Sequence, residues 1–157
     1  MGRAIEAAGG HVDKFIGDGV MALFGVGGNV ADGARQALDA ARRMDLALAE
    51  LNESLSTEIG QRLRIGIGIH AGPAIVGEMG YGRATGLTAI GDTVNVASRI
   101  EALCKPYGAE LVVSDSAAEA AGLGRDGIRL ESTAIRGRAS MIDVLVFPRV
   151  GDLPRQD

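Results

Sequence analysis

The sequence predicts an α+β fold with a mainly antiparallel sheet flanked by helices. Three observations lead to this class: short apolar runs bounded by glycines, which are typical of strands and hairpins; a long run with helical spacing over residues 32–55; and a second helical run over 92–105. The elements follow one another in a ββαββαβαβ-like order. Hairpins mixed with helices, rather than strict strand–helix alternation, favour antiparallel pairing.

The first third of the chain contains a helix end, a hairpin and a long helix. MGRAIEAAGG has its apolar positions on one side and then a Gly-Gly stop, as at the C-terminal end of a helix. HVDKFI and VMALFG are apolar strands joined by a short GDG turn, which predicts a β-hairpin. From Asp32 to Leu55, apolar residues recur at helical spacing with charged residues between them, which predicts a long amphipathic helix.

The remaining two thirds alternate strands with short helices. RLRIGIGIHAG predicts a strand and AIVGEMG its partner, across the turn at Gly72-Pro73. A glycine-rich loop, GYGRATG, leads to the short strand LTAIG and to the helix DTVNVASRIEALCK, which we expect Asp92 to cap. ELVVS is a strand, SDSAAEAAG is a short helix, and IRLESTAIRGRASMIDVLVFP supplies the closing strands.

Composition narrows the class of protein. With 157 residues, 46% hydrophobic and 23% charged, the chain suits one globular domain, placed over residues 1–148 with a polar tail over 149–157. A net charge of −4 without a Lys/Arg run longer than two excludes a nucleic-acid partner. Cys104 is the single cysteine, so no internal disulfide forms. The sequence has no membrane segment or signal peptide, and we expect a cytoplasmic chain.

The stretch KFIGDG places a carboxylate between two glycines at the tip of the first hairpin. Asp18 has two interpretations: Asp-Gly is a strong hairpin turn signal, and a loop carboxylate is also how proteins hold Mg²⁺ beside substrate phosphates. Lys14, four residues earlier, is by itself an ordinary surface lysine. The pattern alone leaves both interpretations of Asp18 open.

A second candidate cluster lies in LTAIGDTVNVASRIEA. Asn95 and Arg99 are four residues apart on one predicted helix, so they share a face and can reach one ligand. The structural alternative is a helix-start amide and a solvated arginine. Against that alternative, the apolar residues around them make the helix largely buried, so an amide and a guanidinium projecting from it need a partner with oxygen atoms.

A third candidate is IRGRAS, where Arg136 and Arg138 flank a glycine before the final strand. A guanidinium in such a loop can meet a phosphate. Loop arginines are also commonly just exposed to solvent, and the spacing does not decide between the two.

Together these stretches resemble one family, the class III nucleotidyl cyclases, which make cyclic AMP or cyclic GMP. The resemblance runs from the first residue to about Phe147, and KFIGDGVMALFG and AIGDTVNVASRIEALCKPYGAELVVS carry it. It implies a ferredoxin-like (βαββαβ-type) palm with a mainly antiparallel sheet. It also implies a homodimer whose active sites lie at a head-to-tail interface.

The resemblance implies a role for each matching residue. Asp18 matches one of the two carboxylates that hold two divalent cations, Mg²⁺ or Mn²⁺. Asn95 matches the residue that orients the ribose, and Arg99 the one that meets charge on the α-phosphate. Asp18 of one subunit would then act with Lys14, Thr88, Asn95 and Arg99 of the other. Arg136 and Arg138 are further candidates for binding the substrate phosphates.

The resemblance also bears on the base. Adenylyl members carry a Lys at the position of Lys14 and an Asp or Thr seven residues before the Asn, whereas guanylyl members carry Glu and Cys or similar residues. A lysine donor and a hydroxyl suit the N1 acceptor and 6-amino donor of adenine, while the N1–H and O6 of guanine reverse that pattern. Lys14 and Thr88 therefore predict conversion of ATP to cyclic AMP and pyrophosphate in signal transduction.

One family feature has no match here. The first metal-binding Asp of the family lies in a Phe-x-Asp-(Ile/Leu)-x-Gly-Phe stretch, which the sequence lacks. We therefore expect a cyclase domain without its first strand and first helix, and little activity from these residues alone. Alternatives are an inactive nucleotide-binding pseudo-cyclase, a ferredoxin-like regulatory module and a guanylate cyclase. The sequence leaves open any upstream regulatory domain, bicarbonate regulation and the choice among Mg²⁺, Mn²⁺ and Ca²⁺.

Overall fold

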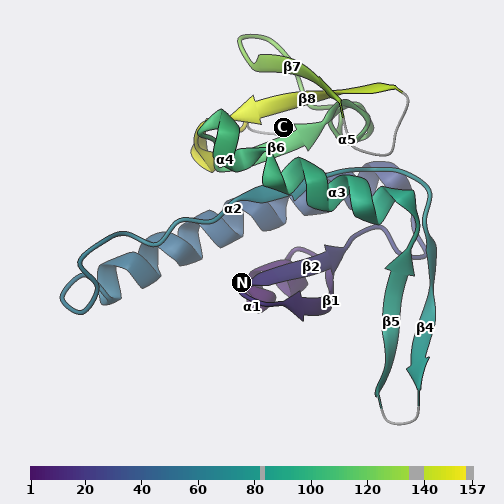
Figure 1. Ribbon diagram of the computed structural model, residues 1–157, viewed down its shortest axis with the longest axis horizontal. Helices are drawn as coiled ribbons and strands as arrows, with labels where there is room; N and C mark the ends of the chain where they lie inside the picture. Colours follow the sequence, from purple (N-terminus) through teal and green to yellow (C-terminus); the bar gives the residue numbers. More distant parts are fainter. Residues whose placement is uncertain (82–83, 135–139, 155–157) are drawn as a thin grey trace.

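The computed structural model describes residues 1–81, 84–134 and 140–154 and shows an α+β molecule with three mainly antiparallel sheets and flanking helices (Figure 1). In chain order the elements are α1 (Gly2–Ala7), β1 (His11–Ile16), β2 (Gly19–Leu23), α2 (Val30–Ser54), β3 (Ile67–Ile69), β4 (Ile75–Tyr81), β5 (Ala84–Ile90), α3 (Asp92–Ala102), α4 (Cys104–Tyr107), β6 (Leu111–Ser114), α5 (Asp115–Ala121), β7 (Arg129–Ala134), β8 (Met141–Phe147) and the 3₁₀ turn η1 (Val150–Asp152).

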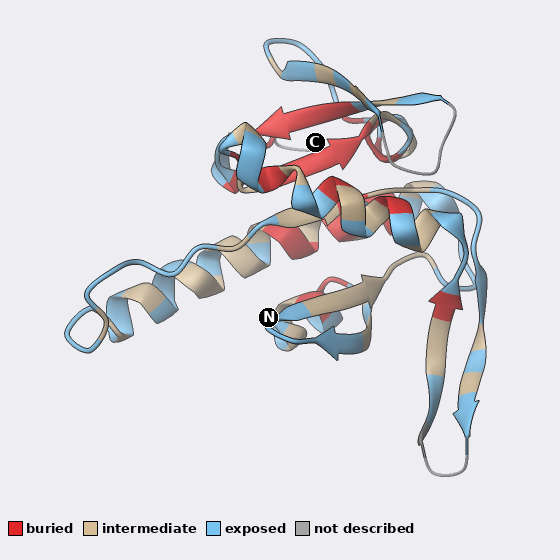
Figure 2. Ribbon diagram, viewed as in Figure 1, coloured by how far each residue is buried: buried red, intermediate tan, exposed pale blue. Residues whose placement is uncertain are grey.

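The core is built around a four-stranded sheet with the order β3-β6-β8-β7, in which only β3 and β6 are parallel. Side chains alternate between the two faces of its strands. Leu111 and Leu145 pack with α2 and α5 on one face, whereas Val112 and Val144 pack with α3 and α4 on the other. Because both faces are covered, the burial in Figure 2 is concentrated in β6, β8 and the helices against them.

The helix α2 begins where the sequence offers a cap. Asn29 is its N-cap, and the Asn29 side chain accepts a hydrogen bond of 2.8 Å from the backbone N–H of Asp32. The buried residues lie in the N-terminal half of α2, while its C-terminal half extends away from the sheet (Figure 1). No helix among the described residues is long and apolar enough to cross a membrane.

Two separate hairpins complete the molecule. The strands β1 and β2 pair antiparallel, as the sequence predicts, and β4 and β5 form a second antiparallel pair. The β4–β5 hairpin projects from the body as an arm (Figure 1). Val150 and Leu153, which follow the predicted domain limit at 148, are buried against the core.

Three local expectations are wrong. The strand Ile75–Tyr81 does not pair with the strand before it: β4 pairs with β5, whereas β3 is three residues long and pairs in parallel with β6. Within the glycine-rich stretch GYGRATG, expected to be a loop, Gly80 and Tyr81 belong to β4 and residues 84–86 belong to β5. Asp92 is also not the cap of α3, because Gly91 occupies the N-cap and Asp92 is the first helical residue. The carboxylate still favours the positive end of the helix.

Candidate active site

Asp18 lies exposed at the tip of the β1–β2 hairpin. The pairing of Ile16 with Gly19 leaves Gly17 and Asp18 as the two turn residues. Gly17 has φ +62°, and among the residues that the structure describes none other than glycine has positive φ. This is the arrangement of a type II′ turn, which requires glycine at its first central position. The turn therefore depends on Gly17 and does not require an aspartate at 18, which weakens the purely structural interpretation of Asp18.

A bulge in β1 brings two consecutive residues toward β5. The register shifts between Val12 and Lys14, so Asp13 has no partner in β2. A bulge re-aims side chains that would otherwise point to opposite faces. As a result both Asp13 and Lys14 contact Thr88 on β5.

Lys14, Thr88 and Asp13 form a connected polar cluster. The Lys14 Nζ donates to Thr88 Oγ1 at 2.9 Å, and Thr88 Oγ1 donates to Asp13 Oδ2 at 2.7 Å. Lys14 Nζ also lies 3.5 Å from Asp13 Oδ1, and the Ala89 backbone N–H donates to Asp13 Oδ2 at 3.4 Å. The side chain of Asp13 is 2% exposed and that of Lys14 46%. The carboxylate thus lies behind a lysine and a hydroxyl that are open to a ligand.

The helix α3 carries the second pair of candidate residues. Asn95 is exposed and Arg99 is partly exposed, and the two are one turn apart on the same helix, as predicted. Val96 and Ile100, which are fully buried on the adjacent face, hold the helix against the sheet. Arg99 has a bonding partner within the structure. The strand β5 leads through Gly91 directly into α3, so Thr88 and Asn95 belong to consecutive elements.

A very close strand–helix contact fixes the position of α3. A Cβ atom added at Gly68 on β3 would lie 2.3 Å from the backbone nitrogen of Glu101 and 2.8 Å from the carbonyl oxygen of Ala97. Only glycine allows α3 to approach β3 this closely. Gly68 therefore determines how far the face bearing Asn95 and Arg99 stands from the sheet.

The available metal ligands suit a cation that binds together with substrate phosphates rather than one coordinated by protein side chains alone. Among the described residues, no three His, Cys, Asp or Glu side chains gather into a group that could hold a metal ion. Asp18 offers one carboxylate, and Mg²⁺ is commonly held by one or two carboxylates together with substrate phosphates. Asp18 fits that use. Arg136 and Arg138 lie outside the described residues.

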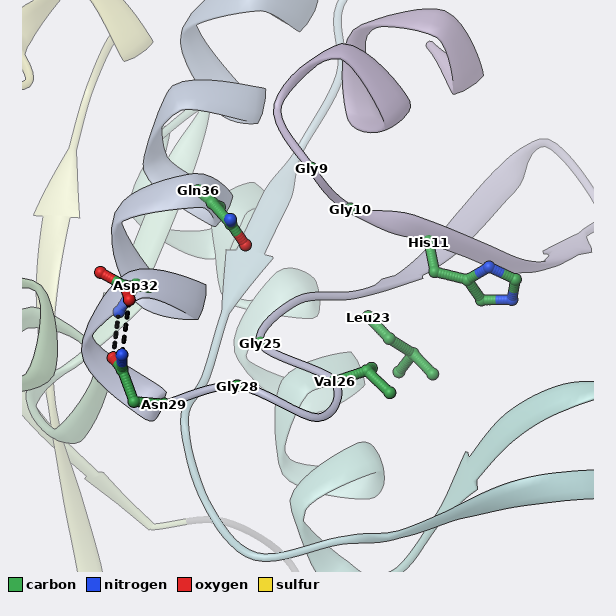
Figure 3. A pocket seen from close by; sticks show the side chains of 10 residues that line it. All are labelled: Gly9, Gly10, His11, Leu23, Gly25, Val26, Gly28, Asn29, Asp32 and Gln36. Carbon is green, nitrogen blue, oxygen red and sulfur yellow. Dashed lines mark hydrogen bonds between the residues drawn. The ribbon is translucent and has the colours of Figure 1, made fainter.

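A separate pocket of about 370 Å³ lies between the end of α1, the hairpin and the start of α2 (Figure 3). None of the predicted site residues that the structure describes lines it. Its acidic group, Asp32, is already bonded to Asn29 and Arg35, and these bonds hold the pKa of Asp32 below its usual range. His11 Nε2 donates a hydrogen bond of 3.3 Å to the Leu87 carbonyl oxygen, which lies outside the pocket. The pocket residues thus serve the cap of α2 and the β1–β5 contact.

Asp13 is the site residue that sequence reasoning missed. In a regular strand it would point away from Lys14, because successive side chains alternate. The only available signal was an acidic residue inside the predicted strand, directly before the lysine. Without the bulge, that signal gives no reason to place the carboxylate beside Thr88.

Comparisons with known proteins show what the sequence and the fold are similar to. A sequence model of the adenylate and guanylate cyclase catalytic domain matches residues 5–145. The chain is 44% identical over 120 residues to an adenylate cyclase of Anabaena cylindrica, covering 74% of this chain and 23% of that protein. It is 35% identical over 144 residues to the terminal-differentiation-specific adenylate cyclase of Dictyostelium discoideum, covering 90% of this chain and 7% of that protein.

The solved structure of the guanylyl cyclase Cya2 has the same fold. It superposes with a TM-score of 0.80 at 31% identity, covering 96% of this chain and 75% of that chain. The present chain spans less than a quarter of the length of the two curated relatives. These relatives are named as adenylate cyclases and as a guanylyl cyclase. The choice between adenine and guanine must therefore be argued from the residues of the site.

Proposed function

The chain belongs to the adenylate and guanylate cyclase catalytic domain family, and on that premise we propose that it acts in an adenylate cyclase that converts ATP to 3′,5′-cyclic AMP and pyrophosphate. The observation that carries the proposal is the contact between Lys14 and Thr88. One lysine N–H can donate to N1 of adenine, and the Thr88 oxygen can accept from the 6-amino group. Guanine presents the reverse pattern at both atoms, which a polar site rejects strongly.

The remaining residues supply positioning and charge. Asn95 would orient the ribose so that its 3′-hydroxyl faces the α-phosphate. As the 3′-oxygen bonds to the α-phosphorus and pyrophosphate leaves, charge builds on the α-phosphate oxygens, and the Arg99 guanidinium would stabilise it. A divalent cation bound by Asp18 and the nucleotide phosphates would neutralise the triphosphate. Arg136 and Arg138 are proposed as further phosphate contacts.

The exposed apolar side chains support a homodimer. Phe15 and Ile16 near the tip of the first hairpin are 69% and 64% exposed, and Ile75 and Tyr81 on the arm are 67% and 94% exposed. Large apolar side chains on two projecting hairpins are typical of surfaces covered by a partner. In the proposed head-to-tail dimer, Asp18 of one subunit completes the site formed by residues of the other. A nucleotide cyclase of this kind would serve intracellular signalling.

The experiment that tests the proposal is complementation. Because Asp18 is the only carboxylate that the family resemblance assigns to the metals here, the chain alone should make little cyclic nucleotide with Mg²⁺ or Mn²⁺. The chain is therefore mixed with the catalytic domain of a relative, such as the Anabaena adenylate cyclase, whose counterparts of Asn95 and Arg99 are replaced by alanine. Cyclic AMP from ATP in the mixture, and not from either component alone, is expected.

The control is the same mixture made with the Asn95→Ala, Arg99→Ala variant of this chain, which should produce no cyclic AMP. A mixture that makes cyclic GMP from GTP and no cyclic AMP would support the second candidate function, a guanylate cyclase, which the similarity to Cya2 favours. Robust cyclase activity from the 157-residue chain by itself would contradict the account of the metal site. No product from any mixture would contradict the proposed enzyme.

A further inference from the structure

Asp13 has no role in the function described so far, although it is the most buried charged group of the site. Its side chain is 2% exposed and both of its oxygens are used. Oδ2 accepts from the Thr88 hydroxyl at 2.7 Å and from the Ala89 backbone N–H at 3.4 Å, while Oδ1 lies 3.5 Å from the Lys14 ammonium. A buried carboxylate is stable only with such partners. Asp13 lies directly behind Lys14 and Thr88, the pair proposed to bind the base.

The donor and the acceptor of each hydrogen bond in this cluster can be assigned. An ionised carboxylate has no proton to donate and an ammonium group has no lone pair, so Thr88 must donate to Asp13 and accept from Lys14. The single hydroxyl proton is therefore committed. One lone pair of Thr88 Oγ1 and one N–H of Lys14 remain for a ligand. The cluster presents one acceptor and one donor, in fixed positions.

We propose that Asp13 is a positioning residue that sets the base specificity of the site, by fixing the Thr88 hydroxyl as a hydrogen-bond acceptor. A threonine hydroxyl can otherwise rotate and donate, in which case it would suit O6 of guanine as well as the 6-amino group of adenine. With its proton held by Asp13, the hydroxyl offers adenine an acceptor and opposes guanine O6 with a lone pair. The proposal rests on the proposed function, because it concerns how the same site selects ATP over GTP.

A merely structural role for Asp13 makes a different prediction. As an anchor between β1 and β5, Asp13 would affect stability and the binding of both nucleotides equally. As a polarity-setting residue, it affects the ratio of the two affinities, and only while Thr88 keeps its hydroxyl. The ratio and its dependence on Thr88 therefore separate the two roles.

The test measures the dissociation constants of Mg²⁺-ATP and Mg²⁺-GTP for the 157-residue chain, by titration followed through backbone amide NMR shifts of Thr88 and Ala89. In the unaltered chain, the mismatch of Thr88 with guanine O6 should make ATP bind about tenfold more tightly than GTP, beyond the preference that Lys14 sets at N1. Asp13→Ala, and Asp13→Leu as a variant that fills the side-chain space, should reduce this tenfold contribution to about twofold or less. Asp13→Asn keeps an acceptor oxygen for Thr88 and should retain most of the ratio.

Two controls make the result specific. Asp126→Ala removes an exposed aspartate from a distant turn and should leave the ratio unchanged. Thr88→Val should by itself remove the tenfold contribution of the hydroxyl and leave the preference set by Lys14, and Asp13→Ala should then change the ratio no further. A chain that prefers ATP, and whose Asp13→Ala or Asp13→Leu variant keeps the ratio of the unaltered chain, would overturn this inference alone. A chain that binds ATP no better than GTP would overturn the proposed adenylyl function as well.

Discussion

Replacing Gly68 by alanine should both destabilise the fold and displace the catalytic helix. The added methyl carbon would lie 2.3 Å from Glu101 N, 2.7 Å from Glu101 Cα and 2.8 Å from Ala97 O, all of them backbone atoms of α3. Ordinary van der Waals contact begins near 3.4 Å. The helix α3 must therefore move about 1 Å away from β3, and overpacking of this kind costs about 1–3 kcal/mol.

The free energy of unfolding of the chain can be measured by urea titration with circular dichroism. A loss of about 2 kcal/mol corresponds to a drop of about 1 M in the urea midpoint, because the slope for a small domain is about 1–3 kcal/mol/M. Gly86→Ala is the matched control, since Gly86 is also a strand glycine but nothing lies within 4 Å of its added Cβ. If Gly68→Ala unfolds at the same urea concentration as Gly86→Ala, the close contact does not exist as described.

Three further predictions concern the active site and the single thiol. In the complemented enzyme, Arg99→Ala should lower kcat by about 100-fold and change KM far less, because its partner charge develops in the transition state; a mutant that loses only affinity in steady-state kinetics would contradict that role. Lys14→Glu with Thr88→Cys should shift the ratio of kcat/KM toward GTP, and an unchanged ATP preference would place base reading elsewhere. Burial raises the pKa of the Cys104 thiol to about 11 from 9.0, so the unfolded chain loses this proton first as the pH rises and stability should fall between about pH 9 and pH 11. Urea titrations at pH 8 and pH 10 measure this fall, and Cys104→Ala should have a smaller one; an equal fall in the variant would assign it to other groups.

Local sequence signals predicted the elements that carry the site. The alternating strands around the GDG turn gave the hairpin, and helical spacing gave both α2 and the helix bearing Asn95 and Arg99. These features depend on neighbours within a few residues. For the same reason the shared face of Asn95 and Arg99 could be predicted, because a spacing of four residues in a helix leaves no other geometry.

Features that depend on distant partners could not be predicted. The pairing of β3 with β6 joins residues 67 and 111, and no local pattern distinguishes that partner from the adjacent strand at 75–81. The bulge at Asp13 could not be predicted from the sequence because it is defined by the pairing of β1 with β2. The metal role of Asp18 stays a prediction. What the structure adds there is that the hairpin turn depends on Gly17, so the carboxylate is available for another use.

Two separate contacts hold the two halves of the site in place. The base-reading cluster is held by the contact of the β1 bulge with β5, through Asp13 and Thr88. The catalytic face of α3 is held by the approach of Gly68 to α3. Displacement of α3 should slow the reaction of both nucleotides alike, since about 1 Å of misplacement can cost about 100-fold in rate whatever the base. Loss of the Asp13 acceptor should alter the choice of base instead. Because the two contacts share no residue, the effects of Gly68→Ala and Asp13→Ala on the free energy of the transition state should add. A strong coupling between the two substitutions would show that base choice and turnover are set by one contact rather than two.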